Sequence, residues 1–80
     1  MARVEIGRYL ATDTRVCGGR LIFRGTRILV ADVLELLESG YSADAAARQY
    51  PGVLDSRAVR EAVSLTRKGV VREVVRRHAA

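Results

Sequence analysis

The change in hydrophobic spacing at residue 30 most constrains how this chain folds. Before residue 30, apolar residues form short runs such as 21–23 or alternate loosely. From Val30 onward they recur every three or four residues, which is the period of an amphipathic helix. A chain of 80 residues has room for one small core. The sequence therefore predicts a single domain that is mainly α with a small N-terminal β element, an α+β class.

The β element, over residues 1–29, is predicted to contain a tight hairpin. Two β-prone runs, residues 21–23 and 26–30, are separated only by Arg24-Gly25. Gly25 supplies the positive φ that a two-residue turn requires. Cys17-Gly18-Gly19 predicts a second turn. Short strands with unpaired edges are marginal alone, so we expect residues 1–29 to join two copies in a homodimer.

Three helices are predicted after the β element, over residues 30–39, 43–49 and 56–68. Ser42 and Asp55 are suitable N-caps for the second and third helices. Pro51 ends the second helix because it forces the preceding residue out of the helical region. Residues 30–68 therefore match a homeodomain-like helix-turn-helix, with a turn at 50–54 and the last helix as recognition helix.

The third predicted helix carries the candidate DNA-binding surface. Its apolar residues fall on one side, and its charged residues, Glu61 included, fall on the other. Arg57 and Arg60 lie near its start, where a recognition helix contacts base edges, and the later cations suit phosphates. The complete set of DNA-binding candidates is Arg57, Arg60, Ser64, Arg67 and Lys68. A solvated helix in any small α-helical domain gives a similar pattern.

Charge is distributed unevenly along the chain. Residues 1–27 have a balance of +4, residues 28–55 of −4 and residues 56–80 of +5, which together give the net charge of +5. A basic C-terminal third beside an acidic middle is typical of nucleic-acid binders. A solvated Arg-rich surface explains the charge equally well.

Residues 69–80 are predicted to form a basic C-terminal tail or helix. Its apolar stripe and its cations are Val70, Val71, Val74, Val75, Arg72, Arg76 and Arg77. One hypothesis is that these residues bind a protein partner, with the valines buried and the arginines paired with acids. The alternative is that the stripe closes the core of the chain itself or a dimer interface.

Composition excludes several classes of protein. The lone Cys17 cannot form an intramolecular disulfide, and one Cys with one His (His78) cannot build a metal site. Asp32, Glu35 and Glu38 share a helix side, but without His partners a solvated face is favoured over a metal site. No run approaches the ~18 apolar residues of a membrane helix. We therefore expect a cytoplasmic binding protein, not an enzyme, with no cofactor and no membrane association.

The stretch from Cys17 to Ile28 resembles the signature of the domain-of-unknown-function 433 family, which is roughly Cys-Gly-Gly-x-Pro-x-Ile-x-Gly-Thr-Arg-Ile. The signature residues in this chain are Gly18, Gly19, Gly25, Thr26 and Arg27, and Leu21 stands where the family usually has Pro. From the residues alone, Gly25-Thr26-Arg27 is a hairpin in which Thr26 satisfies the turn and Arg27 pairs with an acid, rather than an anion site, because no Gly-Lys-Ser/Thr follows. Cys17 is more often a packing residue than a redox sensor.

The resemblance extends over roughly residues 8–66 and implies a function. Members of this family are small proteins with a helix-turn-helix, and many look like antitoxins related to the VapB type, with a gene beside that of a PIN-like ribonuclease. By this resemblance the chain binds its own operator DNA, autoregulates its operon and neutralises the toxin. The alternative is a protein-interaction subunit that binds an acidic partner through its Arg-rich tail without binding DNA.

Overall fold

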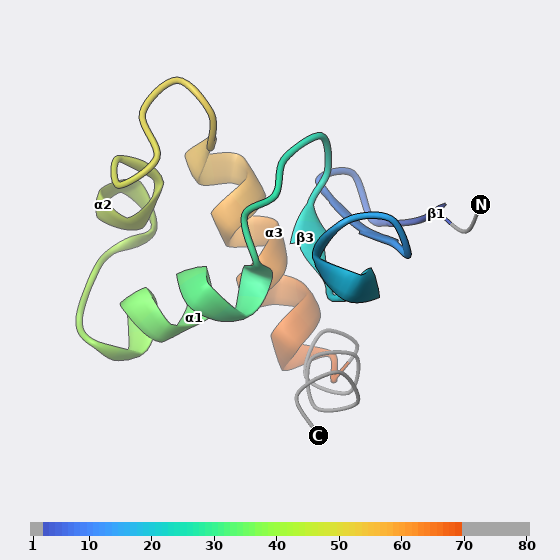
Figure 1. The fold of residues 1–80 in the computed structure, drawn as a ribbon. Coiled ribbons are helices and arrows are strands. Elements are labelled where there is room, and N and C mark those ends of the chain that lie inside the picture. The colour runs from blue at the N-terminus through green and yellow to red at the C-terminus, as the bar shows by residue number, and fades with distance from the viewer. Residues whose placement is uncertain (1–2, 70–80) are drawn as a thin grey trace.

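The computed structural model describes residues 3–69, and these form a small α+β fold (Figure 1). The described strands and helices are β1 (Arg3–Ile6), β2 (Leu10–Asp13), the 3-10 turn η1 (Cys17–Gly19), β3 (Ile22–Phe23), α1 (Val30–Glu38), α2 (Ala43–Ala47) and α3 (Ser56–Arg67). In Figure 1, α3 lies between the sheet on one side and α1 with α2 on the other. The predicted class, mainly α with a small β element, is confirmed at this level.

The three strands form an antiparallel sheet in the order β1-β2-β3. The turn between β1 and β2 begins at Gly7, whose φ of +67° lies in the left-handed region that favours glycine. Strand β2 pairs with β3 through Leu10 opposite Phe23 and Ala11 opposite Ile22. The main partner of residues 22–23 is therefore β2 and not the run that follows them in the sequence.

The predicted two-residue hairpin at Arg24-Gly25 is wrong in its length and in its second strand. Only an isolated bridge joins Ile22 to Leu29, and helix α1 begins at the next residue. The N–H of Phe23 donates to the carbonyl of Ile28 at 3.0 Å, so four residues lie in the loop. Gly25 does have a positive φ of +77°, as predicted. Val30 is the first residue of α1 and cannot also extend the predicted second strand, residues 26–30. This strand is therefore shorter than predicted, and the loop before it is longer.

The N-caps predicted for the last two helices are confirmed. The Ser42 hydroxyl accepts the N–H of Ala45 at 3.0 Å, and the Asp55 carboxylate accepts the N–H of Arg57 at 2.7 Å. These bonds satisfy backbone donors that have no partner within the first helical turn. The predicted and observed bounds of α1 and α3 differ by one residue, at the C-terminal end of each.

Helix α2 ends two residues earlier than predicted, at Ala47 instead of residue 49. The N–H groups of Gln49 and Tyr50 donate to carbonyls three residues back, those of Ala46 and Ala47, and this spacing tightens the chain out of the α-helix. Pro51 follows and prevents the helix from resuming. The connection from α2 to α3 therefore covers residues 48–55 and not 50–54.

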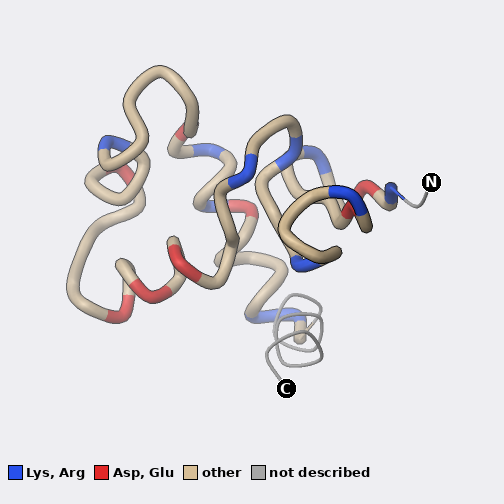
Figure 2. The backbone as a smooth tube through the Cα atoms, in the orientation of Figure 1, with Lys and Arg blue, Asp and Glu red and all other residues tan. Residues whose placement is uncertain are grey.

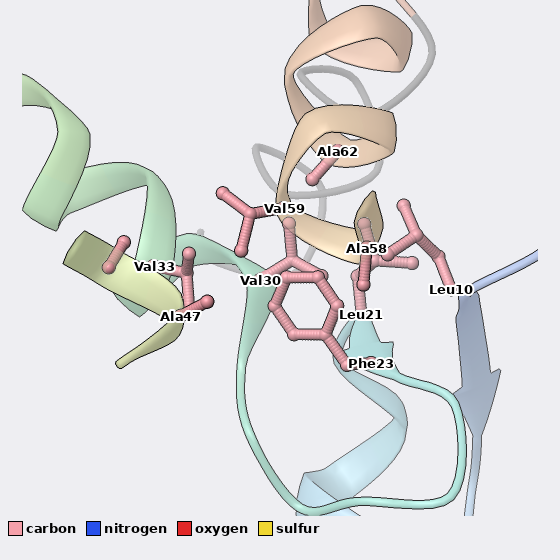
Figure 3. Close-up of a cluster of buried hydrophobic side chains, with 10 residues drawn as sticks. Leu10, Leu21, Phe23, Val30, Val33, Ala47, Ala58, Val59 and Ala62 are labelled. Atoms are coloured by element: carbon pink, nitrogen blue, oxygen red, sulfur yellow. The ribbon is translucent and has the colours of Figure 1, made fainter. Parts of the chain in front are cut away.

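A single hydrophobic core lies where the sheet meets the three helices (Figure 3). The largest fully buried side chains are Phe23 and Leu10 from the sheet, Val30 and Val33 from α1, and Val59 from α3. Helix α3 adds two buried alanines, Ala58 and Ala62. Small side chains on α3 let its backbone approach its neighbours closely, which places this helix in the middle of the fold.

The predicted tail lies almost entirely outside the described residues. Its candidate partner-binding residues Val70, Val71, Val74, Val75, Arg72, Arg76 and Arg77, together with His78, lie beyond residue 69. The last described residue, Gly69, has a φ of +85°, as expected of a glycine that follows a helix. Within residues 3–69, no helix is long and apolar enough to cross a membrane.

Candidate nucleic-acid interface

The five DNA-binding candidates form one exposed stripe along α3 and its C-cap. They are Arg57, Arg60, Ser64, Arg67 and Lys68, and we call them the α3 stripe. The opposite face of the helix is anchored by the buried residues Ala58, Val59 and Ala62. The structure thus places a polar helix face at the surface and holds the helix to the core by its other face, as a recognition helix requires.

Arg57 is held at the start of α3 by Asp55. Its Nη2 lies 2.9 Å from Oδ2 of Asp55, and its Nε lies 3.3 Å from both carboxylate oxygens. The hydrogen bonds from the Arg57 side chain and backbone lower the pKa of Asp55. The same side-chain bond raises the pKa of Arg57, with a smaller contribution from Tyr9 nearby. Asp55 therefore both caps the helix and orients its first arginine.

Arg60 connects α3 to α2. Its Nη2 lies 3.1 Å from Oδ1 of Asp44, and its Nη1 lies 3.4 Å from the hydroxyl of Ser56. The side chains of Arg57 and Arg60 nevertheless remain 73% and 59% exposed. Ion pairs this exposed contribute little to stability, so a phosphate or a base edge can replace the carboxylate at small cost.

Among the described residues, the C-terminal half of the α3 stripe has no acidic partner. Within residues 3–69, neither Arg67 nor Lys68 forms an ion pair, and both are exposed. Figure 2 shows that acidic segments follow α1, whereas basic segments gather on α3 and on the loops of the sheet with some acidic segments among them. The acidic region that the sequence predicts is therefore most distinct along α1.

Glu61 does not belong to the polar face on which the sequence predicts it. Its carboxylate is half-buried against the turn between β1 and β2 and accepts two backbone N–H groups. The N–H of Arg8 lies 2.9 and 3.0 Å from its two oxygens, and the N–H of Tyr9 lies 2.7 Å from Oε1. Glu61 thus fixes the turn against α3. A helical projection misses this role, because it places Glu61 at the border of the polar face and shows no distant partner.

The signature residues lie in two loops: Gly18 and Gly19 in the connection from β2 to β3, and Gly25, Thr26 and Arg27 in the connection from β3 to α1. Gly18 and Gly19 both have positive φ, at +66° and +84°. The Thr26 hydroxyl donates to the carbonyl of Phe23 at 2.7 Å and accepts the N–H of Ile28 at 2.9 Å. The threonine thus closes its own turn, in agreement with the hairpin interpretation. Arg27 is exposed and forms no ion pair within residues 3–69, so the acid partner that this interpretation gives it is absent there.

Within residues 3–69, the remaining candidates form no hydrogen bond or ion pair with the α3 stripe. Cys17 is half-buried, and its Sγ lies 3.5 Å from the carbonyl oxygen of Arg27. Asp32, Glu35 and Glu38 are exposed along α1. The described part of the chain contains no group of three or more His, Cys, Asp or Glu side chains that could hold a metal ion.

The fold and the α3 stripe define a small α+β domain that presents one basic helix at its surface. A family model described as a protein of unknown function (DUF433) matches residues 11–65. This match runs from β2 through most of α3 and includes the Cys17–Ile28 signature, so the chain belongs to the DUF433 family. The comparisons with curated proteins and with solved structures found no match.

Proposed function

We propose that this chain is a DNA-binding, antitoxin-like protein that represses its own operon and neutralises a PIN-like ribonuclease toxin. The observation that carries the DNA-binding part is the α3 stripe: its five polar residues are exposed, while the other face of the same helix is buried. Helices α2 and α3 then act as a homeodomain-like helix-turn-helix with an extended connection over residues 48–55.

The α3 stripe suits contacts of two kinds with duplex DNA. Arg57 and Arg60, near the start of α3, are suited to bidentate contacts with guanine in the major groove. Arg67 and Lys68, without acid partners in the described part of the chain, are suited to phosphates. A phosphate contact contributes salt-dependent affinity, whereas a base contact contributes sequence preference.

A homodimer would place two recognition helices on successive turns of the major groove, about 34 Å apart. Strand β1 is at the edge of the described sheet, with β2 on one side only. Its residues Arg3, Val4 and Glu5 are exposed. An unpaired edge strand is a template for a second copy, which supports dimerisation through residues 1–29.

The antitoxin part of the proposal is supported by the family resemblance. Its candidate partner segment, residues 70–80, lies outside the described residues. Deleting residues 70–80 tests it: we expect binding to a co-expressed PIN-like ribonuclease to be lost while the melting temperature of the free chain is unchanged. A large fall in the melting temperature would instead assign this segment to the chain's own core or dimer.

The DNA-binding part is tested by fluorescence anisotropy with a duplex from upstream of the chain's own gene. We expect Arg57→Ala and Arg60→Ala each to weaken binding on the order of tenfold to hundredfold and to reduce the preference over a random duplex. Arg15→Ala serves as the control, because Arg15 lies beyond the far end of β2 and pairs with Asp13. If both α3 variants keep full affinity, the assignment of a recognition helix fails.

One observation favours the second candidate, a protein-interaction subunit that does not bind DNA. Both arginines at the start of α3 already have carboxylate partners, Asp55 and Asp44. In that case the Arg60–Asp44 pair joins α3 to α2 and the Arg57–Asp55 pair stays within the start of α3, and the wild-type chain binds its acidic partner but neither the upstream nor the random duplex.

A further inference from the structure

The turn between β1 and β2 lies directly beside the α3 stripe. Glu61 follows Arg60 in the sequence and precedes Ser64 by one helical turn, so its side chain borders the stripe. Its carboxylate holds the N–H groups of Arg8 and Tyr9 at 2.7–3.0 Å. Position 8 is thereby fixed at the edge of the proposed interface, although it lies in the N-terminal part of the chain.

The close contact with Glu61 depends on a glycine at position 7. A Cβ built on Gly7 would lie 2.8 Å from the carboxyl carbon of Glu61, closer than such atoms approach. The φ of Gly7 is +67°, which other residues rarely adopt. The contact with Glu61 therefore fixes the position of the turn against α3. It also fixes the backbone of Arg8, and so the direction in which the Arg8 side chain starts.

Arg8 differs from the neighbouring Arg24, which follows β3. The guanidinium of Arg24 lies 3.4 Å from the carboxylate of Glu5, which also pairs with Arg3, so Arg24 has an acidic partner. Arg8 is exposed and forms no ion pair within residues 3–69. An uncompensated cation at the border of a basic helix adds to the potential that attracts a polyanion.

We propose that Arg8 is part of the DNA interface and contacts a phosphate of the strand that flanks the groove entered by α3. Glu61 is the positioning residue, because its carboxylate binds the backbone of the turn and leaves the Arg8 guanidinium free for the ligand. This inference rests on the proposed function and extends it: the ligand is duplex DNA, and the interface combines α3 with the sheet. A phosphate contact at this place would add affinity without sequence preference.

The test is the salt dependence of binding, measured by anisotropy on the upstream and the random duplex. We expect Arg8→Ala to weaken binding to both duplexes by the same factor and to reduce the slope of log K against log salt by about one. Arg8→Lys keeps the charge and should retain the wild-type slope. Arg15→Ala, which removes a cation from the far end of the sheet, should also leave the slope unchanged.

An Arg8→Ala slope equal to that of the wild type overturns the inference while the proposed function stands. A wild-type chain that binds neither duplex overturns the proposed function itself. The role of Glu61 is tested by a double-mutant cycle: in a Glu61→Ala background that remains folded by circular dichroism, Arg8→Ala should have less effect on affinity. Strictly additive effects would show that Glu61 does not position Arg8.

Discussion

Gly7 and Glu61 occupy adjoining space: a Cβ at position 7 would lie 2.8 Å from the carboxyl carbon of Glu61. This pair joins the turn of the β1–β2 hairpin to the middle of α3. Glu61 also accepts the N–H groups of Arg8 and Tyr9, so one side chain adds hydrogen bonds to the hydrophobic contacts that hold the sheet against α3. At Gly7, both the positive φ and the close contact with Glu61 therefore oppose a larger side chain, and variants can separate these two contributions to stability.

Gly7→Ala should lower the free energy of unfolding by more than the backbone conformation alone accounts for. An alanine at positive φ costs about 1–2 kcal/mol, and the added methyl group must also displace the Glu61 carboxylate. Gly52→Ala is the matched control, since Gly52 has a φ of +76° but no atom within 4 Å of the added carbon. Urea denaturation measures both changes, and equal losses would contradict the close contact at Gly7.

Glu61→Ala should destabilise the chain by about 1.5–3 kcal/mol, the range for hydrogen bonds to a charged group. The reason is that two backbone N–H groups of the hairpin turn lose their acceptor. Glu35→Ala, on the exposed face of α1, should change stability by less than about 0.5 kcal/mol. Thermal and urea unfolding of the two variants compare them directly; similar stabilities would mean that the hairpin turn does not depend on Glu61.

Phe23→Ala should cost about 3–5 kcal/mol, because it leaves a cavity at the centre of the core. The Phe23 side chain is 1% exposed, whereas Val53 is 59% exposed. We therefore expect Val53→Ala to have almost no effect on the urea midpoint. If Phe23→Ala unfolds the chain outright, Phe23→Leu supplies the smaller change, which should still exceed that of Val53→Ala.

Acid should destabilise the chain partly through Asp13 and Asp55. The pKa of Asp13 is lowered by the backbone N–H and side chain of Arg15, and that of Asp55 by the side chain and N–H of Arg57. A carboxyl with a lowered folded-state pKa stabilises the fold fully above its ordinary value of 3.8, and this contribution is lost as the pH falls through the lowered value. The urea concentration at the midpoint of unfolding should therefore decrease as the pH is lowered from neutral to acidic.

Asp55→Asn isolates the charge of the second carboxyl, because asparagine is also a good N-cap. The variant should keep α3 and lose less stability than the wild type between pH 5 and about pH 2, the range in which such carboxyls become protonated. Identical pH dependence of the two proteins would assign the acid sensitivity to other carboxyls.

The helices could be predicted because their signals are local. The side chains of Ser42 and Asp55 accept N–H groups only two or three residues away. The apolar spacing that begins at Val30 predicts both ends of α1 to within one helical turn. The strand pairing is harder to predict, because β3 pairs with β2 through residues far apart in the sequence, such as Leu10 and Phe23. No periodicity in the sequence identifies a strand's partner at that separation.

The same distinction applies to the candidate site. The exposure of the α3 stripe follows from helical geometry, so the sequence predicts it from Arg57 to Lys68. The contacts of Glu61 and the place of Arg8 beside the stripe depend on a turn that lies far away in the chain. Sequence patterning assigns such residues to a face and cannot supply the contact that gives them a role.

The central claim, that the α3 stripe binds duplex DNA, is tested most directly by an NMR titration. The ¹⁵N-labelled chain is titrated with the duplex from upstream of its own gene, and the amide shifts are followed to saturation. We expect the largest shifts from Arg57 to Lys68 and at Arg8, with the acidic face of α1 at Asp32, Glu35 and Glu38 unaffected. Two results would contradict the claim that the α3 stripe binds DNA. One is saturation with shifts confined to residues outside α3 and the turn between β1 and β2, and the other is no shift at any DNA concentration.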